Sequence, residues 1–182
     1  MHEIERKFKV RKLPVLTDTP SQKIKQAYLE DFSLENSNPL IRRVRSIDDS
    51  QFFYTEKSEA SADGLICKEE EYKITKKQFE KYLQRYQQGN LISKTRYRYK
   101  IPAYYQVGNK MVHYDNDFIT TEIDVFEEEL SGLVIVEVEF SSKTQAEAFI
   151  PPAWFGKEVT SDKRYRNKNL SEMDLSTLTE LL

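Results

Sequence analysis

The chain opens on MHEIERKFKV, a stretch with charged side chains at every second position. At the two-residue period of a β-strand, Glu3, Glu5 and Lys7 share one face, and the other face is mostly apolar. Carboxylates beside an ammonium group can bind a hard cation and an anion in one place. On an ordinary half-buried strand the same side chains would only face water. The rest of the chain has to decide between these two interpretations.

Charged pairs with this spacing recur along the chain, and each pair carries one sign. The acidic pairs are Glu3/Glu5, Glu69/Glu71, Glu122/Asp124 and Glu137/Glu139, and the basic residues are Arg43/Arg45, Lys94/Arg96, Lys7, Lys57 and Arg164. Lys and Arg can bind the oxygens of a polyanion while carboxylates hold divalent cations that bridge protein and substrate. Phosphates fit this combination. Glycine-rich phosphate loops are absent, so side chains must hold the phosphates.

The opposite faces of these strands are apolar and need a cover. Ile4, Phe8 and Val10 form one such face, and Val136 and Val138 form another. A closed antiparallel barrel covered by helices would bury both faces and turn the charged ones into a shared polar tunnel. We therefore predict an α+β fold in which a closed barrel has a charged lumen and helices packed outside.

Periodicity and turn residues divide the chain into elements. We expect strands at residues 1–10, 23–32, 40–47, 51–58, 65–74, 91–101, 118–130 and 133–142. Helices are expected at 143–150 and 171–182, and residues 102–117 are expected to form a long hairpin or an insertion. The predominance of antiparallel strands indicates the α+β class.

Residues 74–90 show the first change of period. Apolar side chains from Phe79 to Tyr86 follow the spacing of an amphipathic helix. Thr75 is the predicted N-cap, and Gly89 is predicted to end the helix.

Composition limits the class of protein. The 182 residues include 38% hydrophobic and 32% charged side chains, which favours one folded domain over residues 1–182. The net charge of -2 gives no reason to expect nucleic acid or membrane as a partner. The absence of an apolar leader favours a cytoplasmic protein. One cysteine, Cys67, excludes an internal disulfide, and two distant histidines give no zinc spacing, so any metal would bind carboxylates.

The ExExK pattern of Glu3, Glu5 and Lys7 resembles the signature of CYTH domains, the triphosphate tunnel metalloenzymes. An ordered series of further motifs extends the resemblance over nearly the whole chain: RVR, TEK, EEE, KTRY, EID, VEVEF and DKRY. The closing stretch AFIPPAWFGKEVTSDKRYRNKNL resembles the short bacterial members, some of which are inorganic triphosphatases. The resemblance implies an eight-stranded antiparallel tunnel that binds a triphosphate with Mg²⁺ or Mn²⁺ and hydrolyses or rearranges it.

The resemblance also implies a role for each charged position. The implied metal ligands are Glu3, Glu5 and Glu139, and the implied phosphate ligands are Lys7, Arg43, Arg45, Lys57, Lys94, Arg96, Lys163 and Arg164. The other catalytic candidates are Glu69, Glu71, Glu122, Asp124, Glu137 and Tyr28. The acidic members would orient bases, bind a second metal or position the attacking water, and these roles stay open. Tyr28 would approach Lys7 in the tunnel or serve only as a packing aromatic.

Two features depart from the family pattern. Cys67 stands where an arginine is expected before the acidic pair of its strand, which removes one phosphate contact or moves it to Lys68 by a change of register. With no histidine near it in sequence, Cys67 is expected to be inert. The segment 103–118 is longer than the expected hairpin and would alter a tunnel mouth or a partner surface.

Three functions are compatible with these residues. The first is metal-dependent hydrolysis of inorganic triphosphate or another small molecule bearing a triphosphate. The second is a class IV type adenylyl cyclase, and the third is a module that binds polyphosphate or nucleotide without turnover. We expect a small-molecule triphosphate as the partner and leave a homodimer open.

Overall fold

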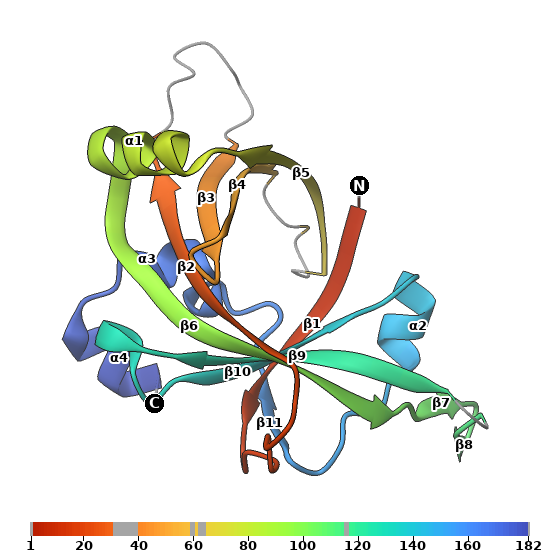
Figure 1. Ribbon diagram of the computed structural model, residues 1–182. Coiled ribbons are helices and arrows are strands. Elements are labelled where there is room, and N and C mark those ends of the chain that lie inside the picture. Colours follow the sequence, from red (N-terminus) through yellow and green to blue (C-terminus); the bar gives the residue numbers. More distant parts are fainter. Residues whose placement is uncertain (1, 31–39, 59–60, 62–64, 115–116, 182) are drawn as a thin grey trace.

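The computed structural model describes residues 2–30, 40–58, 61, 65–114 and 117–181. Its main strands are β1 (His2–Val10), β2 (Ser21–Leu29), β3 (Ile41–Ile47), β4 (Gln51–Lys57), β5 (Ile66–Ile74), β6 (Gln87–Pro102), β9 (Phe118–Phe126), β10 (Val134–Glu139) and β11 (Phe155–Glu158). They pair in the order β10-β9-β6-β2-β3-β4-β5-β1-β11, and β10 also pairs with β1. This last pairing closes an eight-stranded antiparallel barrel, so the predicted architecture is confirmed (Figure 1).

The registers of the strand pairs set which side chains face the lumen. At the closing seam Glu5 lies opposite Glu139 and Lys7 lies opposite Glu137. Because side chains alternate between the two faces of a strand, these four residues share the inner face. The same alternation places Phe8, Val136 and Val138 outside, where they are fully buried.

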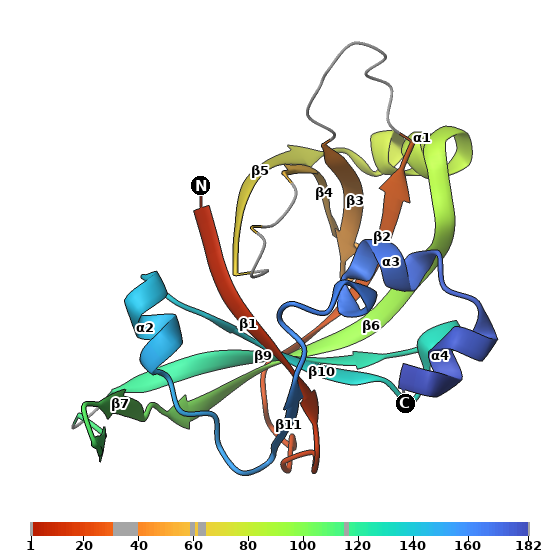
Figure 2. The same cartoon turned by 180° about the vertical axis from the view of Figure 1, so that it is seen from behind.

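Helices cover the outside of the barrel (Figures 1 and 2). The helix α1 (Lys76–Tyr86) packs Phe79 on β2, β3 and β4, in a cluster with Ala27 and Val44. The helix α2 (Lys143–Ala148) lies against β1 and covers the cluster around Phe8. The helices α3 (Asn167–Ser171) and α4 (Leu175–Leu181) extend a third cluster that contains buried residues of β6 and β10.

The boundary of α1 corrects one prediction. Thr75 caps the helix through a reciprocal capping box with Gln78, as expected. The helix ends at Tyr86, however, and Gly89 lies in β6 with φ +65°. A Cβ at Gly89 would lie 2.6 Å from the carbonyl oxygen of Ser171. The glycine therefore permits the close approach of α3 to β6 and does not end a helix.

Other boundaries differ in detail. The predicted strand 118–130 ends at Phe126 and continues as a 3₁₀ turn, η1 (Glu128–Leu130). The predicted helix 171–182 corresponds to α4, and α3 precedes it. The segment after β6 forms a hairpin of β7 (Tyr105–Val107) and β8 (Lys110–Val112), and residues 115–116 lie outside the described residues, as do 31–32 of the second predicted strand. No helix in the described part of the chain has the length and apolar character needed to cross a membrane.

Candidate active site

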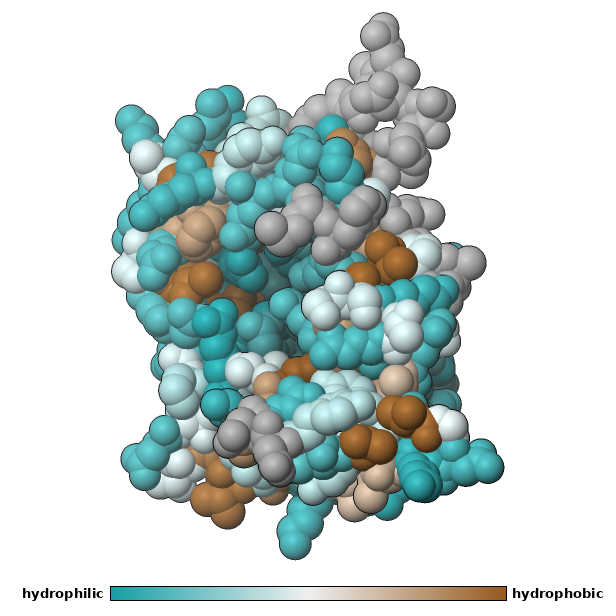
Figure 3. Space-filling view, turned by 90° about the vertical axis from the view of Figure 1, so that its right-hand side faces the viewer, coloured by the Kyte–Doolittle hydropathy of each residue, from teal (hydrophilic) through white to brown (hydrophobic). Residues whose placement is uncertain are grey.

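The barrel encloses a cavity of about 260 Å³, which we call the tunnel. A hydrophilic recess is visible on the face shown in Figure 3. The charged residues that line the tunnel are Glu3, Glu5, Lys7, Arg43, Arg45, Lys57, Glu69, Lys94, Arg96, Arg98, Glu122, Glu137 and Glu139. Most of the predicted site residues therefore meet in one cavity. Cations and carboxylates are nearly balanced within it.

Lys7 stands at the closing seam between two carboxylates. Its Nζ lies 2.6 Å from Glu137 Oε1 and 3.0 Å from Glu5 Oε1. Burial alone would lower the pKa of Lys7, but the charges of Glu137 and Glu5 outweigh it and raise the pKa. Lys7 is therefore a permanent cation at neutral pH, suited to bind a phosphate oxygen and not to accept a proton.

Arg96 is the centre of a second group of ion pairs. Its guanidinium donates to Asp124 Oδ1 at 2.6 Å, to Glu137 Oε2 at 2.7 Å and to Glu122. Burial would raise the pKa of Glu137, yet Lys7, Arg96 and Lys94 hold it well below the usual value. Glu137 is thus a fixed anion that orients two cations.

Asp124 lies beneath the tunnel wall and is 1% exposed. It accepts from Lys94 Nζ at 2.5 Å and from Arg96 Nη2 at 2.6 Å. Lys94 is 2% exposed, and burial lowers its pKa although Asp124 opposes the shift. Among the roles left open for the acidic residues, Asp124 has the position of one that orients bases.

The arginines of β3 face the acidic pair of β5. Arg43 Nη2 lies 3.0 Å from Glu69 Oε1, and Arg45 Nη2 lies 2.7 Å from Glu71 Oε2. In the described part of the chain, the buried Nε atoms of both arginines have no hydrogen-bond partner. Buried donors of this kind are costly unless a ligand satisfies them. They fit an anion in the tunnel.

The implied metal ligands lie on the same part of the tunnel wall. Glu3 Oε2 accepts from Lys57 Nζ at 2.7 Å, and Glu5 contacts Lys7, so both carboxylates face lysines. Among the described residues no three acidic, histidine or cysteine side chains already converge on one point. Burial and the charges of neighbouring carboxylates, Glu122 foremost, raise the pKa of Glu139 to about 7. Repelling carboxylate oxygens of this kind are hard donors that fit Mg²⁺ or Mn²⁺.

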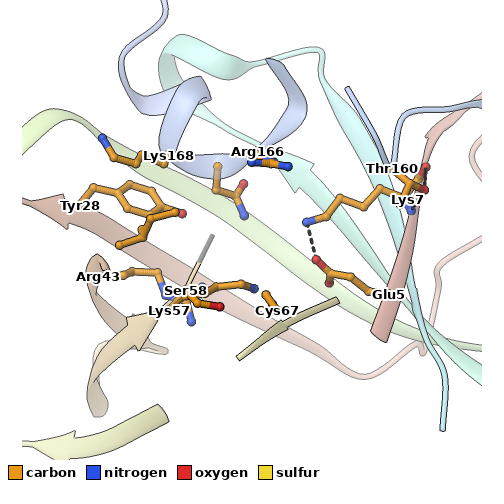
Figure 4. A pocket seen from close by; sticks show the side chains of 12 residues that line it. Glu5, Lys7, Tyr28, Arg43, Lys57, Ser58, Cys67, Thr160, Arg166 and Lys168 are labelled. Atoms are coloured by element: carbon orange, nitrogen blue, oxygen red, sulfur yellow. Dashed lines mark hydrogen bonds and ion pairs between the residues drawn. The ribbon is translucent and has the colours of Figure 1, made fainter. Parts of the chain in front are cut away.

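A smaller cavity adjoins the tunnel beside α3, and we call it the end chamber (Figure 4). Tyr28, Cys67, Thr160, Arg166 and Lys168 line it in addition to residues that it shares with the tunnel. Tyr28 is 5% exposed and packs in the cluster beneath α3, as the packing interpretation expects, and its approach to Lys7 stays a prediction. Its phenol has a raised pKa because of burial and stays neutral.

The surroundings of Cys67 support the prediction that its thiol is inert. Its Sγ lies 3.3 Å from Glu3 Oε2. Burial raises the pKa of the thiol to about 11, which keeps it protonated at neutral pH.

Lys163 and Arg164 lie elsewhere than the resemblance implies. Both are exposed in the 3₁₀ turn η2 (Lys163–Tyr165), and neither lines the tunnel or the end chamber. Arg164 Nη2 pairs with Asp162 Oδ2 at 2.7 Å, because the turn directs Tyr165 inward and leaves Lys163 and Arg164 exposed. Arg166 is the arginine of this segment that reaches the site.

Some lining residues were absent from the sequence prediction. Arg98 continues the basic face of Lys94 and Arg96, so strand alternation was a sufficient signal for it. Gln22 and Gln26 line the tunnel from β2, where uncharged amides gave no signal. Arg166 and Lys168 follow a turn and a short helix, to which no strand periodicity applies.

A closed antiparallel barrel whose lumen carries facing cations and carboxylates defines a tunnel protein suited to polyanions and cations. No family model matches the chain. It is 40% identical to an inorganic triphosphatase of Nitrosomonas europaea over 94% of the chain and 97% of that protein. It is 30% identical to an inorganic triphosphatase of Acetivibrio thermocellus over 70% of the chain and 69% of that protein.

The structural comparison agrees with the sequence comparison. A crystal structure of an inorganic triphosphatase superposes with a TM-score of 0.63 at 37% identity, covering 94% of this chain and 95% of that one. The chain belongs to the family of these inorganic triphosphatases.

Proposed function

We propose that this protein hydrolyses inorganic triphosphate inside its tunnel, with Mg²⁺ or Mn²⁺ as the cofactor. The observation that carries the proposal is the tunnel itself, where cations of β1, β3, β4 and β6 face carboxylates of β1, β5, β9 and β10. The names of the relatives support the same substrate. The ExExK motif and the eight-stranded barrel support placing the chain within the CYTH, or triphosphate tunnel metalloenzyme, superfamily.

Each group of residues has a distinct task in this proposal. The proposed phosphate ligands are Lys7, Arg43, Arg45, Lys57, Lys94 and Arg96, to which we add Arg98 and Arg166 because they line the tunnel and the end chamber. Lys163 and Arg164 are left out because both are exposed outside the tunnel. Glu3, Glu5 and Glu139 would hold the cation, whose contribution is to neutralise charge on the transferred phosphoryl group.

The hydrolytic step consumes one water. The water attacks a terminal phosphorus, the P–O bond to the leaving diphosphate breaks, and the proton of the water passes to a carboxylate of the tunnel or to the products. Fixed cations such as Lys7 and Arg96 stabilise negative charge on the phosphoryl oxygens, and Glu137 and Asp124 orient these cations.

Product analysis by ³¹P NMR tests the proposal. With Mg²⁺ present, inorganic triphosphate should yield equal amounts of phosphate and diphosphate. ATP that yields cyclic AMP and diphosphate would instead favour the cyclase hypothesis. Tight binding of triphosphate without any product would favour the binding module.

A further inference from the structure

The end chamber differs from the tunnel in its balance of charge. The charged residues that line the chamber are Lys7, Arg43, Lys57, Arg166 and Lys168, together with one carboxylate, Glu5. Lining cations therefore exceed carboxylates strongly here, whereas the two are nearly equal in the tunnel. Lys7, Arg43 and Lys57 also pair with carboxylates on the tunnel side. A cation of the chamber that has no such partner is therefore the one that attracts an anion most strongly.

Two guanidinium groups of the chamber retain unused donors. The guanidinium of Arg166 makes no hydrogen bond or ion pair with any residue in the described ranges, although the residue is partly buried. Arg43 Nε is buried and has no partner among the described residues. Lys168 differs, because its Nζ is paired with Glu172 at 2.8 Å. Arg166 is thus the cation of α3 and its flank that is available to a ligand.

Arg166 and Cys67 line the same chamber from different elements (Figure 4). Cys67 belongs to β5 and occupies the position where an arginine was expected. Arg166 immediately precedes α3, and its side chain enters the chamber from the side of that helix. A cation missing from the barrel wall is therefore accompanied by a cation supplied from the covering helix.

The size of the chamber limits its occupant. Its volume is about 80 Å³, well below the roughly 300–1,000 Å³ of pockets that take drug-sized ligands. A nucleoside does not fit this space, whereas one phosphoryl group does. The chamber also opens to the tunnel through the shared residues Lys7, Arg43 and Lys57.

We infer that the end chamber is a separate subsite for one terminal phosphoryl group of a linear polyphosphate, and that Arg166 is its specificity-determining residue. The inference deepens the proposed function and rests on it for the identity of the substrate. Arg166 takes over the phosphate contact that Cys67 cannot make. The remaining phosphoryl groups extend from the chamber into the tunnel, toward the carboxylates of the closing seam.

Binding and turnover measured on the same variants test this inference. The probe is inorganic triphosphate, with calorimetry in EDTA for the dissociation constant and phosphate release in Mg²⁺ for KM and kcat. Arg166→Gln should weaken binding and raise KM by about tenfold or more, since a charge-assisted hydrogen bond is lost. Arg85→Gln, which removes an exposed charge of α1 on the outside of the barrel, should change neither.

A compensating variant separates binding from mere stability. Cys67→Arg places a cation on the opposite wall, and in the Arg166→Gln background it should restore most of the lost affinity. Arg166→Lys, which keeps the charge, should bind within a few-fold of the wild type. A purely structural role for Arg166 would give no rescue by Cys67→Arg.

The outcomes distinguish this inference from the proposed function. An unchanged dissociation constant and KM in Arg166→Gln would overturn the inference that the chamber binds a phosphoryl group. A wild-type protein that does not bind triphosphate in EDTA would overturn it too. A wild type that binds but does not hydrolyse triphosphate would contradict the proposed function alone. In that case, loss of affinity in Arg166→Gln would still support a phosphoryl subsite in the chamber.

Discussion

Glu5 and Glu139 lie directly opposite each other where β1 and β10 close the barrel. Like charges at opposed positions of a strand pair destabilise the pairing. Folding alone does not explain such an arrangement at the seam that holds the barrel shut. A bound cation would convert this repulsion into a favourable contact with both carboxylates.

Replacing Glu139 with Gln should therefore stabilise the metal-free protein. Glu139 has a pKa of about 7 in the folded protein because of burial and the nearby carboxylates. A carboxyl pKa raised by folding contributes stability at low pH that is lost as pH rises from about 4.3 to 7. In EDTA at pH 8, Glu139→Gln should be more stable than the wild type, on the order of 0.5–1 kcal/mol.

Thermal unfolding in EDTA between pH 5 and pH 8 measures this effect. The difference between the variant and the wild type should widen as pH rises. Glu80→Gln, on the exposed face of α1, serves as the control and should follow the wild type. A variant less stable than the wild type at pH 8 would contradict repulsion at the seam.

Asp124→Asn should be strongly destabilising. Asp124 is 1% exposed and is shared by Lys94 and Arg96, so its loss leaves buried cations without their partner. Removal of one partner from a buried ion pair costs about 3–5 kcal/mol. Urea unfolding gives the free energy, and the exposed pair of Asp49 with Lys25 provides the control. Asp49→Asn should leave the free energy of unfolding unchanged. An equally small change in Asp124→Asn would mean that the buried ion pairs do not stabilise the fold.

Cys67 should react slowly with iodoacetamide in the native protein. The thiolate is the reactive form, and burial raises the pKa of this thiol to about 11 against about 8.5 in an unfolded chain. At pH 8 we expect alkylation to be roughly 100-fold slower in the native state than in urea. The native rate should rise steeply with pH above 9, as measured by mass spectrometry. Equal rates in the two states would show that the thiol is neither buried nor shifted.

Gly89→Ala should loosen α3 from the barrel. The new Cβ would clash with the carbonyl oxygen of Ser171, and φ is +65°. Gly108 in the β7–β8 turn has φ +58° and open space around its Cα, so Gly108→Ala carries the backbone strain without the clash. We expect about 1–2 kcal/mol of destabilisation from the strain in either variant. Only Gly89→Ala should lose hydrogen-exchange protection in α3, and equal protection in both variants would argue against this packing.

Much of the barrel and of its site could be predicted because strand periodicity carries the information. Alternation at Glu3, Glu5 and Lys7 fixes which side chains share a face, and the apolar opposite face requires a cover. These two facts together lead to a lined tunnel. The register that sets Glu5 opposite Glu139 depends on which strands pair, so alternation within one strand could not predict it.

The C-terminal part of the site was less predictable. The implied phosphate ligand was Arg164, two positions from the arginine that enters the end chamber. A 3₁₀ turn and a short helix lie here, and the burial of Tyr165 determines which neighbours point outward. The prediction that Gly89 ends a helix was wrong for a similar reason, since the role of this glycine depends on its contact with α3, which is distant in sequence.

Phosphate release from inorganic triphosphate by the wild type and by Glu139→Gln, with Mg²⁺, Mn²⁺ or EDTA, tests the central claim most directly. We predict release by the wild type that requires Mg²⁺ or Mn²⁺. Release by the variant should be at least about 100-fold lower, because in the proposed function Glu139 holds the metal and its replacement retains the fold. Release that persists in EDTA, or a variant as active as the wild type at saturating triphosphate, would contradict a metal-dependent hydrolase at this seam.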